Sequence, residues 1–275
     1  MTQEVELSGI WWNVDSLRAQ RERSWAGRVV HRIVEMQQVY DPDWMCIQEG
    51  HDYPNGNLQE MIHAATDWDF RFEPGVKYEN GHNGRVKGDE YTEGLATFSK
   101  LPIKGSRAVK LGVNPQTNGR DWHCEQHILD TILETDAGDI TIGNTHLTSP
   151  RPHYISARRR EIANLKKHIK DRPLDEAYVI GGDFNSLRPV FIFSPFSAMR
   201  HLRDTLDLYT GTRQNPTWIY GAGEKHLLRF NLDYVGVPRE SRLTVKEFEV
   251  LDRGGSDHTP LRAKFVIDSA LTAQA

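Results

Sequence analysis

The sequence predicts an α/β protein in which two mixed β-sheets pack face to face with helices outside them. Strand-like apolar runs occur in both halves of the chain, each half also has apolar residues at helical spacing, and the second half repeats the plan of the first. Two packed sheets bury both sets of strands in a single domain. A chain of 275 residues can bury roughly three quarters of the surface that its unfolded form exposes, so it needs no disulfide or metal for stability.

The first half alternates strand and helix. Val29, Ile33 and Val34 recur at helical spacing, and Asp41-Pro42 ends that helix. The short run that begins at Trp44 is apolar enough for a buried strand. We therefore expect helices at 26–40 and 58–65, and strands at 5–14, 44–48 and 69–72.

The segment from Gly75 to Thr92 has the composition of a loop. It contains four glycines among lysine, arginine and histidine residues, and is too polar to pack. We expect a mobile surface loop here, inside one domain that covers residues 1–275. A C-terminal tail is expected from about residue 268 to 275.

The second half is richer in consecutive strands. Asp136-Ala137-Gly138-Asp139 is typical of a hairpin turn, and Ile162, Leu165 and Ile169 form the apolar stripe of a helix. The helix is expected at 155–170. The expected strands are 94–99, 107–112, 126–134, 139–146, 178–180, 232–237, 243–251 and 261–267.

Charge and cysteine content exclude several classes of protein. The chain has 34 Lys and Arg against 38 Asp and Glu, a net charge of −4, which argues against a protein that coats nucleic acid non-specifically but leaves room for a local basic groove. Its two cysteines, Cys46 and Cys124, cannot form a disulfide scaffold and lack zinc-finger spacing. Cys46 lies in an apolar run and is expected to be a buried free thiol.

The start of the sequence resembles neither a signal peptide nor a membrane anchor. No basic segment precedes an apolar one, and no apolar stretch approaches the roughly 18 residues that a membrane span requires. We expect a soluble, cytoplasmic monomer, although a secreted chain whose signal had been removed would look the same.

Polar residues gather where the expected strands begin or end. Taken singly, each is an ordinary turn former or surface residue. Together they would be unfavourable without a cation, and oxygen-rich ligands without sulfur favour Mg²⁺ or Mn²⁺. The glycines before Asp183 indicate a close backbone approach, as expected beside a substrate. The residues are Asn13, Gln48-Glu49, Thr92-Glu93-Gly94, Asn144-Thr145-His146, Gly181-Gly182-Asp183-Phe184-Asn185, Asp233 and Gly255-Ser256-Asp257-His258.

This ordered series closely resembles the endonuclease/exonuclease/phosphatase superfamily, whose members share the deoxyribonuclease I fold. The likeness extends from Asn13 to Phe265, nearly the whole chain, and the Gly-Asp-Phe-Asn and Ser-Asp-His motifs are its most specific parts. The resemblance implies a four-layer α/β sandwich and phosphoester hydrolysis that depends on a divalent metal ion.

The resemblance also implies roles for the metal-side residues. Glu49 would be the main metal ligand, with Asn13 beside it and Asp257 near the metal. Asp183 would orient and deprotonate the attacking water, and Asn185 would hold the phosphate or the nucleophile.

Two histidines complete the implied machinery. His258 and His146 would contact phosphate oxygens and supply the proton to the leaving group. The resemblance suggests two dyads, His146 with Asp233 and His258 with Glu93, in which a carboxylate orients each ring and favours its charged form.

The substrate class has to be inferred from less specific features. His146 in a Thr-His-Leu setting is similar to deoxyribonuclease I, neutral sphingomyelinases, deadenylases and tyrosyl-DNA phosphodiesterases. We therefore expect a phosphodiesterase acting on nucleic acid, with a phospholipid (sphingomyelinase-type) or small-molecule phosphodiesterase or phosphatase as the alternative. A non-catalytic binding module is a remote third alternative. The presence of Glu49, Asp183 and His258 argues against it.

Three sequence features are candidates for substrate contacts. Trp218 and Tyr220 lie in a polar loop and could stack on a base. The aromatic run at 191–196 follows Asn185 and is either a core cover, a stacking platform or a lipid-inserting segment. Arg158 begins a run of three arginines, for which a solvated helix face competes with phosphate binding.

Overall fold

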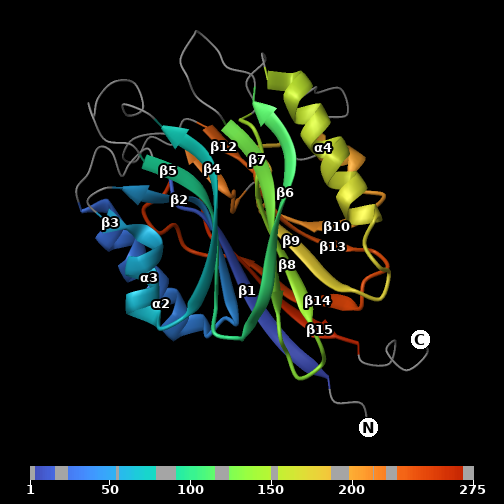
Figure 1. Cartoon of the computed structure of the whole chain (residues 1–275), viewed down its shortest axis with the longest axis horizontal. Coiled ribbons are helices and arrows are strands. Elements are labelled where there is room, and N and C mark those ends of the chain that lie inside the picture. The colour runs from blue at the N-terminus through green and yellow to red at the C-terminus, as the bar shows by residue number, and fades with distance from the viewer. Residues whose placement is uncertain are drawn as a thin grey trace.

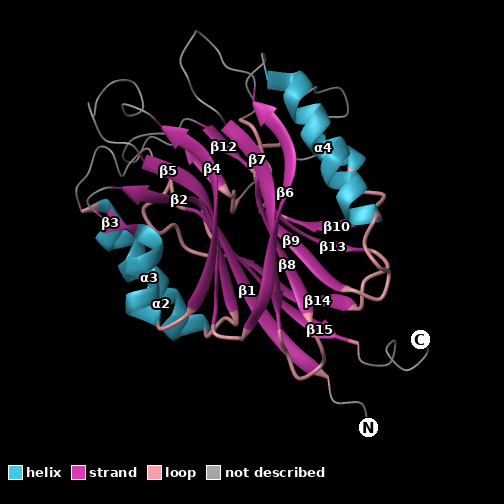
Figure 2. Ribbon diagram, viewed as in Figure 1, coloured by secondary structure: helices cyan, strands magenta, loops and turns pink. Residues whose placement is uncertain are grey.

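The computed structural model describes residues 4–15, 24–53, 56–78, 91–114, 124–149, 154–186, 198–212, 214–220 and 228–268. Two mixed β-sheets pack face to face, with α2 and α3 on one outer side and α4 on the other (Figure 1). Figure 2 shows how few helices accompany the strands. The predicted sandwich of two mixed sheets is confirmed.

The two sheets are joined edge to edge at a single register pair, Val76 of β4 with Cys124 of β7. The first sheet has the order β4 (Asp69–Tyr78), β5 (Tyr91–Ser99), β2 (Trp44–Tyr53), β1 (Val5–Asn13), β15 (Leu261–Ile267) and β14 (Leu243–Val250). The second has the order β10 (Leu206–Tyr209), β13 (Asp233–Pro238), β9 (Ala177–Asp183), β8 (Ile140–His146), β7 (Cys124–Leu133) and β6 (Ile103–Asn114).

Smaller elements lie at the margins of the sandwich. A two-residue strand pairs with β2, a separate two-stranded sheet sits near the end of the chain, and one 3₁₀ turn precedes β10. These are β3 (Gly56–Asn57), β11 (Trp218–Tyr220), β12 (Leu228–Phe230) and η3 (Ala198–His201).

The helices begin and end close to their predicted limits. They are α2 (Trp25–Tyr40), α3 (Leu58–Thr66) and α4 (Ile155–Lys170). The side chain of Asn57 accepts a hydrogen bond from the backbone N–H of Glu60 and so caps α3. Asp41 ends α2 in the left-handed conformation, with its N–H bonded to the carbonyl of Gln37.

Three apolar clusters account for the layering. The central cluster contains Trp11, Trp44 and Phe265 from the first sheet together with Ile142 and Val179 from the second, so the two sheets meet there. A second cluster lies between the first sheet and α2 and α3. A third lies between the second sheet and α4. The order of layers is therefore helix, sheet, sheet, helix.

The strand directions bring the polar residues to one end of the sandwich. β1 and β2 run parallel to each other, as do β8 and β9, whereas β5, β13 and β15 run antiparallel to their neighbours. The carboxyl ends of β1, β2, β8 and β9 therefore lie at the same end of the sandwich as the amino ends of β5, β13 and β15. This explains why motifs so far apart in the sequence form one site.

The expected loop at 75–92 is shorter than predicted. Gly75–Tyr78 belongs to β4, and β5 begins at Tyr91, because the two strands continue to pair at this end. Residues 79–90 lie outside the described residues, and so do residues 269–275, which make up most of the expected C-terminal tail. The short strands β10, β11 and β12 have too few residues for a periodic signal and were not predicted.

Two smaller expectations also have outcomes. Cys46 is fully buried, and burial raises the pKa of its thiol. Within the described ranges, the helices are all too short or too polar to cross a membrane.

Candidate active site

His146 and Asp183 end neighbouring parallel strands and lie opposite each other in the register of β8 and β9. Asp233 begins β13, which is antiparallel to β9, and is the register partner of Asp183. Three potential catalytic side chains are thus placed on adjacent strands at one end of the second sheet. Their positions follow from backbone pairing and not from loop conformation.

The backbone takes left-handed conformations at two of the site residues. Glu49 has φ 58° at a bulge in β2, and Asn185 has φ 47° just after β9. Such values are uncommon for side chains with a Cβ and occur often at functional sites. Gly182 has φ 135°, and a Cβ there would lie 2.0 Å from the carbonyl oxygen of Thr145. The close approach inferred for the glycines is thus made by the protein's own backbone and by Trp11, which leaves no space beside Gly181.

The carboxylate of Asp183 lies at the centre of the site and is only 1% exposed. Its Oδ1 accepts the backbone N–H of Asn185 at 2.7 Å, and its Oδ2 accepts Nδ2 of Asn13 at 3.1 Å. The Nε2 atoms of His146 and His258 each lie 3.6 Å from Oδ2. Asp183 therefore lies between two imidazole rings and is held by hydrogen bonds from Asn185 and Asn13.

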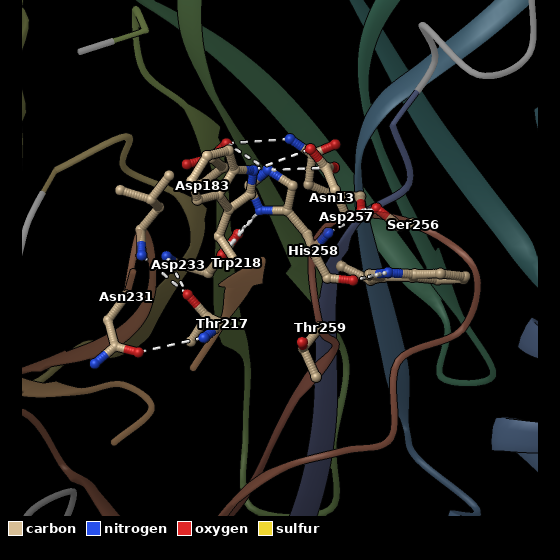
Figure 3. A network of polar contacts seen from close by, with 12 residues as sticks. Asn13, Asp183, Thr217, Trp218, Asn231, Asp233, Ser256, Asp257, His258 and Thr259 are labelled. Carbon is tan, nitrogen blue, oxygen red and sulfur yellow. Dashed lines mark hydrogen bonds and ion pairs between the residues drawn. The ribbon is translucent and has the colours of Figure 1, made fainter. Parts of the chain in front are cut away.

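His258 and Asp233 form a buried pair (Figure 3). Nδ1 of the ring lies 2.9 Å from Oδ2 and 3.0 Å from Oδ1 of the carboxylate. Burial lowers the pKa of His258, but the charges of Asp233 and Asp183 outweigh it and raise that pKa well above its usual value. Burial, opposed by the His258 charge and assisted by Asp183, raises the pKa of Asp233 to about 6. The neighbouring carboxylates thus favour the protonated form of the His258 ring.

The dyads expected from the resemblance are therefore paired wrongly. Asp233 binds His258 and not His146, because the pairing of β13 with β9 places Asp233 beside Asp183. Glu93 lies instead in a group with His146 and Glu49, whose ligand atoms are all within 4.8 Å of one another. Glu93 reaches this group because β5 is the neighbour of β2.

Asn13 contacts the acids through its amide nitrogen. Nδ2 donates to Oε1 of Glu49 and to Oδ2 of Asp183, both at 3.1 Å, while Oδ1 accepts the backbone N–H of Asp15. In this arrangement Asn13 ties the two carboxylates together. Its role as a metal ligand stays a prediction, and it would require the amide to turn.

Asp257 is held by Trp218. The indole Nε1 donates to Oδ2 of Asp257 at 3.0 Å, and one face of the indole stacks on Phe230, with ring centroids 5.8 Å apart. The backbone of Trp218 also forms an isolated bridge with His258. Trp218 is therefore part of the site, but its N–H and one ring face are already engaged.

The other predicted substrate contacts have different outcomes. Arg158 is only 2% exposed and donates through Nη2 to the carbonyl of Asn185, so the solvated-face reading is wrong for it and right for Arg159 and Arg160. The Tyr220 side chain and the aromatic run at 191–196 lie outside the described residues.

Ser256 and Thr217 support the site through hydrogen bonds that no sequence motif predicts. Ser256 Oγ donates to the carbonyl of Asn13 and accepts the N–H of His258, which joins β1 to the His258 loop. Thr217 Oγ1 accepts the N–H groups of Leu232 and Asp233 (Figure 3). Ser256 belongs to the Ser-Asp-His motif of the sequence, although no part was assigned to it, whereas Thr217 has no local signal.

The donor atoms suit a hard divalent cation. Glu49, Glu93 and His146 form one group of potential ligands, and Asp183, Asp233 and His258 form another. Carboxylate oxygens dominate both groups, and such sets are typical of Mg²⁺ or Mn²⁺ sites.

Comparison with known proteins agrees with this arrangement. Residues 10–258 match the endonuclease/exonuclease/phosphatase family, so this chain belongs to that family. A structure of an endonuclease/exonuclease/phosphatase from Beutenbergia cavernae superposes with a TM-score of 0.71 at 20% identity, over 95% of this chain and 72% of that one. The human Nocturnin catalytic domain, solved with a bound sulfate anion, superposes with a TM-score of 0.67 at 19% identity, over 97% of each chain.

One curated relative is similar in sequence. The inositol phosphosphingolipids phospholipase C of Saccharomyces cerevisiae is 28% identical over 151 residues, which are 50% of this chain and 31% of the yeast protein. Members of the family are divalent-metal-dependent phosphoester hydrolases. The four-layer sandwich and the metal-binding type of site expected from the sequence are those of this family.

Proposed function

We propose that this protein is a divalent-metal-dependent phosphodiesterase that hydrolyses nucleic acid by in-line attack of a water molecule. The observation that carries the proposal is the environment of Asp183. Its carboxylate lies 3.6 Å from Nε2 of both His146 and His258, and Asp233 supports the second ring. A base and two potential proton donors are thus placed around one small space, as hydrolysis of a phosphoester requires.

Each residue takes one part in the reaction. Asp183 accepts a proton from water while the water oxygen forms a bond to phosphorus. The bond from phosphorus to the leaving oxygen breaks, and the imidazolium of His258 gives that oxygen its proton. His146 donates a hydrogen bond to a non-bridging oxygen. The carboxylates of Asp233 and Asp183 raise the pKa of His258, which favours the protonated ring that this role needs.

Glu49 is the residue that we assign to the metal, with Glu93 and Asp257 near it. The carboxylates of Glu49 and Glu93 suit Mg²⁺ or Mn²⁺ better than zinc. When bound, such a cation stabilises the charge that develops on the phosphoryl oxygens. Asn185 holds the Asp183 side of the site, since its N–H binds that carboxylate.

Nucleic acid is the first substrate class that we propose, because a half-buried indole lies beside the metal-side residue Asp257. Phospholipid is the second, because the yeast relative is by name a phospholipase C for inositol phosphosphingolipids. Both substrates are phosphodiesters, so the same Asp183 and His258 chemistry serves either.

A turnover panel tests the proposal. Purified protein with Mg²⁺ or Mn²⁺ is compared on plasmid DNA, single-stranded RNA, sphingomyelin and bis-p-nitrophenyl phosphate, with chelator as the control. Hydrolysis of either nucleic acid that stops in chelator supports the proposal, whereas cleavage of sphingomyelin alone favours the phospholipid. Full activity in excess chelator, or no turnover of any substrate, contradicts it.

Two variants of Trp218 sharpen the choice. If the ring stacks on a base, Trp218→Ala is expected to reduce the interaction with nucleic acid by roughly 1–3 kcal/mol and so to lower its turnover. Trp218→Phe should have little effect on nucleic acid, and Trp218→Ala should have little effect on turnover of bis-p-nitrophenyl phosphate. If the N–H to Asp257 is what matters, both variants lower turnover on every substrate.

A further inference from the structure

The inner face of α4 contacts the loops that follow both catalytic strands. Arg158 Nη2 donates to the carbonyl of Asn185, two residues after β9 ends. One turn along the helix, Glu161 accepts the N–H of Thr148 at 3.0 Å and its Oγ1 at 2.5 Å, two residues after β8 ends. A charged residue of α4 thus binds the chain two residues beyond the end of each strand.

These charged side chains are buried at a cost that helix packing does not explain. Arg158 is 2% exposed and Glu161 is fully buried. Burial lowers the pKa of Arg158 and raises that of Glu161, because both charges are poorly solvated. Apolar residues of similar size commonly pack such positions as well or better. Their polar contacts therefore need a separate reason.

The two loops are also joined to each other. The N–H of Leu147 donates to the carbonyl of Asp183 at 2.9 Å, and Nδ2 of Asn185 donates to the carbonyl of Leu147 at 2.8 Å. Asn185 keeps its φ of 47° within this network, and its N–H is the donor to Oδ1 of Asp183. A shift of the Asn185 backbone would therefore move the carboxylate that we assign as the base.

We propose that Arg158 and Glu161 are positioning residues: Arg158 fixes Asp183 through Asn185, and Glu161 fixes His146 through Thr148. This inference rests on the proposed function for the roles of Asp183 and His146. It assigns to α4 a part in catalysis that acts through Asn185 and Thr148.

Arg158→Met and Glu161→Gln test the proposal, with Arg160→Met as the matched control on the exposed side of the same helix. On bis-p-nitrophenyl phosphate, Arg158→Met is expected to lower kcat by about 100-fold with little change in KM, since small misplacements of reacting groups have effects of that size. Glu161→Gln, which retains an acceptor oxygen, is expected to lower kcat by about tenfold. Arg160→Met should match the unmodified protein.

A second measurement does not depend on turnover. Amide hydrogen exchange should become faster at Asn185 in Arg158→Met and at Thr148 in Glu161→Gln, and stay unchanged at both in Arg160→Met. Should Arg158→Met fail to fold, Arg158→Lys replaces it, because it keeps the charge and one donor and is expected to have an intermediate kcat.

The outcomes separate this inference from the proposed function. If the unmodified protein hydrolyses phosphodiesters and Arg158→Met and Glu161→Gln keep full kcat, the positioning role is overturned while the function stands. If the unmodified protein hydrolyses none, the function fails. In that case the exchange pattern decides whether α4 holds the two loops. Unchanged exchange in both variants would overturn the positioning role of Arg158 and Glu161 as well.

Discussion

The second sheet buries charged side chains towards both of its ends, but the two groups are neutralised differently. Near the start of β9, Arg172 reaches Asp130 at 2.7 Å and also pairs with Glu176, and its guanidinium lies 3.9 Å from the ring centre of Tyr178. His168 adds a further contact to Asp130 at 2.9 Å. This group contains its own permanent cation, Arg172, which pairs with both of its carboxylates.

At the other end of β9 the carboxylates are paired with histidines instead, and the buried cation Arg158 donates to the carbonyl of Asn185 rather than forming an ion pair with Asp183. Over the ranges that the structure describes, Asp183 and Asp233 form ion pairs with histidines and none with lysine or arginine. Glu49 and Glu93 add further negative charge nearby. The difference teaches that one cluster is built for stability, whereas the other depends on protons and an added cation, as expected of a reaction centre.

The largest expected effect is that of Asp183→Asn. The substitution keeps the shape of the side chain and the acceptor for the Asn185 N–H, but removes the charge that we propose takes the proton from water. We expect kcat to fall by about 10²–10⁴-fold, the usual loss for a missing acid, base or charge stabiliser. Thermal unfolding is measured in parallel. Retained turnover would remove Asp183 from its assigned role and with it the contrast between the two ends.

Arg172→Met is expected to affect stability and not turnover. It leaves Asp130 and Glu176 without their guanidinium partner in a largely buried place, which should lower the free energy of unfolding by about 3 kcal/mol. Denaturant unfolding measures this. Arg239→Met is the matched control, because the Arg239–Asp207 pair is more than half exposed and should contribute less than about 1 kcal/mol. Equal effects for the two variants would contradict a stabilising role for the buried guanidinium of Arg172.

Glu49→Gln should separate metal binding from folding. In the unmodified protein, Mn²⁺ at 100 times its dissociation constant is expected to add about 2.7 kcal/mol to the free energy of unfolding. In Glu49→Gln the gain should largely disappear, while the metal-free protein stays at least as stable because one repelling charge is gone. Thermal unfolding with and without Mn²⁺ measures both quantities, and an undiminished shift would exclude Glu49 as the main ligand.

The smallest expected effect is a coupling energy within the corrected dyad. Because Asp233 binds His258, Asp233→Asn and His258→Ala should act through the same step, and the double variant should lose less than the sum by roughly 0.5–3 kcal/mol. Asp233→Asn with His146→Ala is the comparison pair and should be closer to additive. The reverse result, coupling to His146 and none to His258, would contradict the pairing of Asp233 with His258.

Much of the fold could be predicted because periodic and capping signals are local. The helix at 155–170 was predicted to the residue, and the turn at Gly138 follows from its glycine. Most strands were predicted with shorter limits, since β2 and β5 continue into polar residues where only the neighbouring strand supports the pairing. The residues that form the site could be predicted because the order of the motifs is also contained in the sequence.

The partners within the site could not be predicted in the same way. Which carboxylate orients which histidine depends on strand neighbours, and Asp233 meets His258 only because β13 pairs with β9. The orientation of the Asn13 amide, the burial of Arg158 and the bond from Trp218 to Asp257 are likewise tertiary contacts between segments far apart in the chain. No spacing in the sequence encodes them.

The buried amide of Asn144 has a mechanical consequence. It belongs to β8, yet its Nδ2 donates to the carbonyls of Ile47 and Ala96 in the opposite sheet, and its Oδ1 accepts Nε2 of Gln48 at 2.7 Å. Glu49 comes from the first sheet and Asp183 from the second. Asn144 therefore resists sliding of one sheet over the other. A substitution there would shift Glu49 relative to Asp183 although neither of these side chains had been changed.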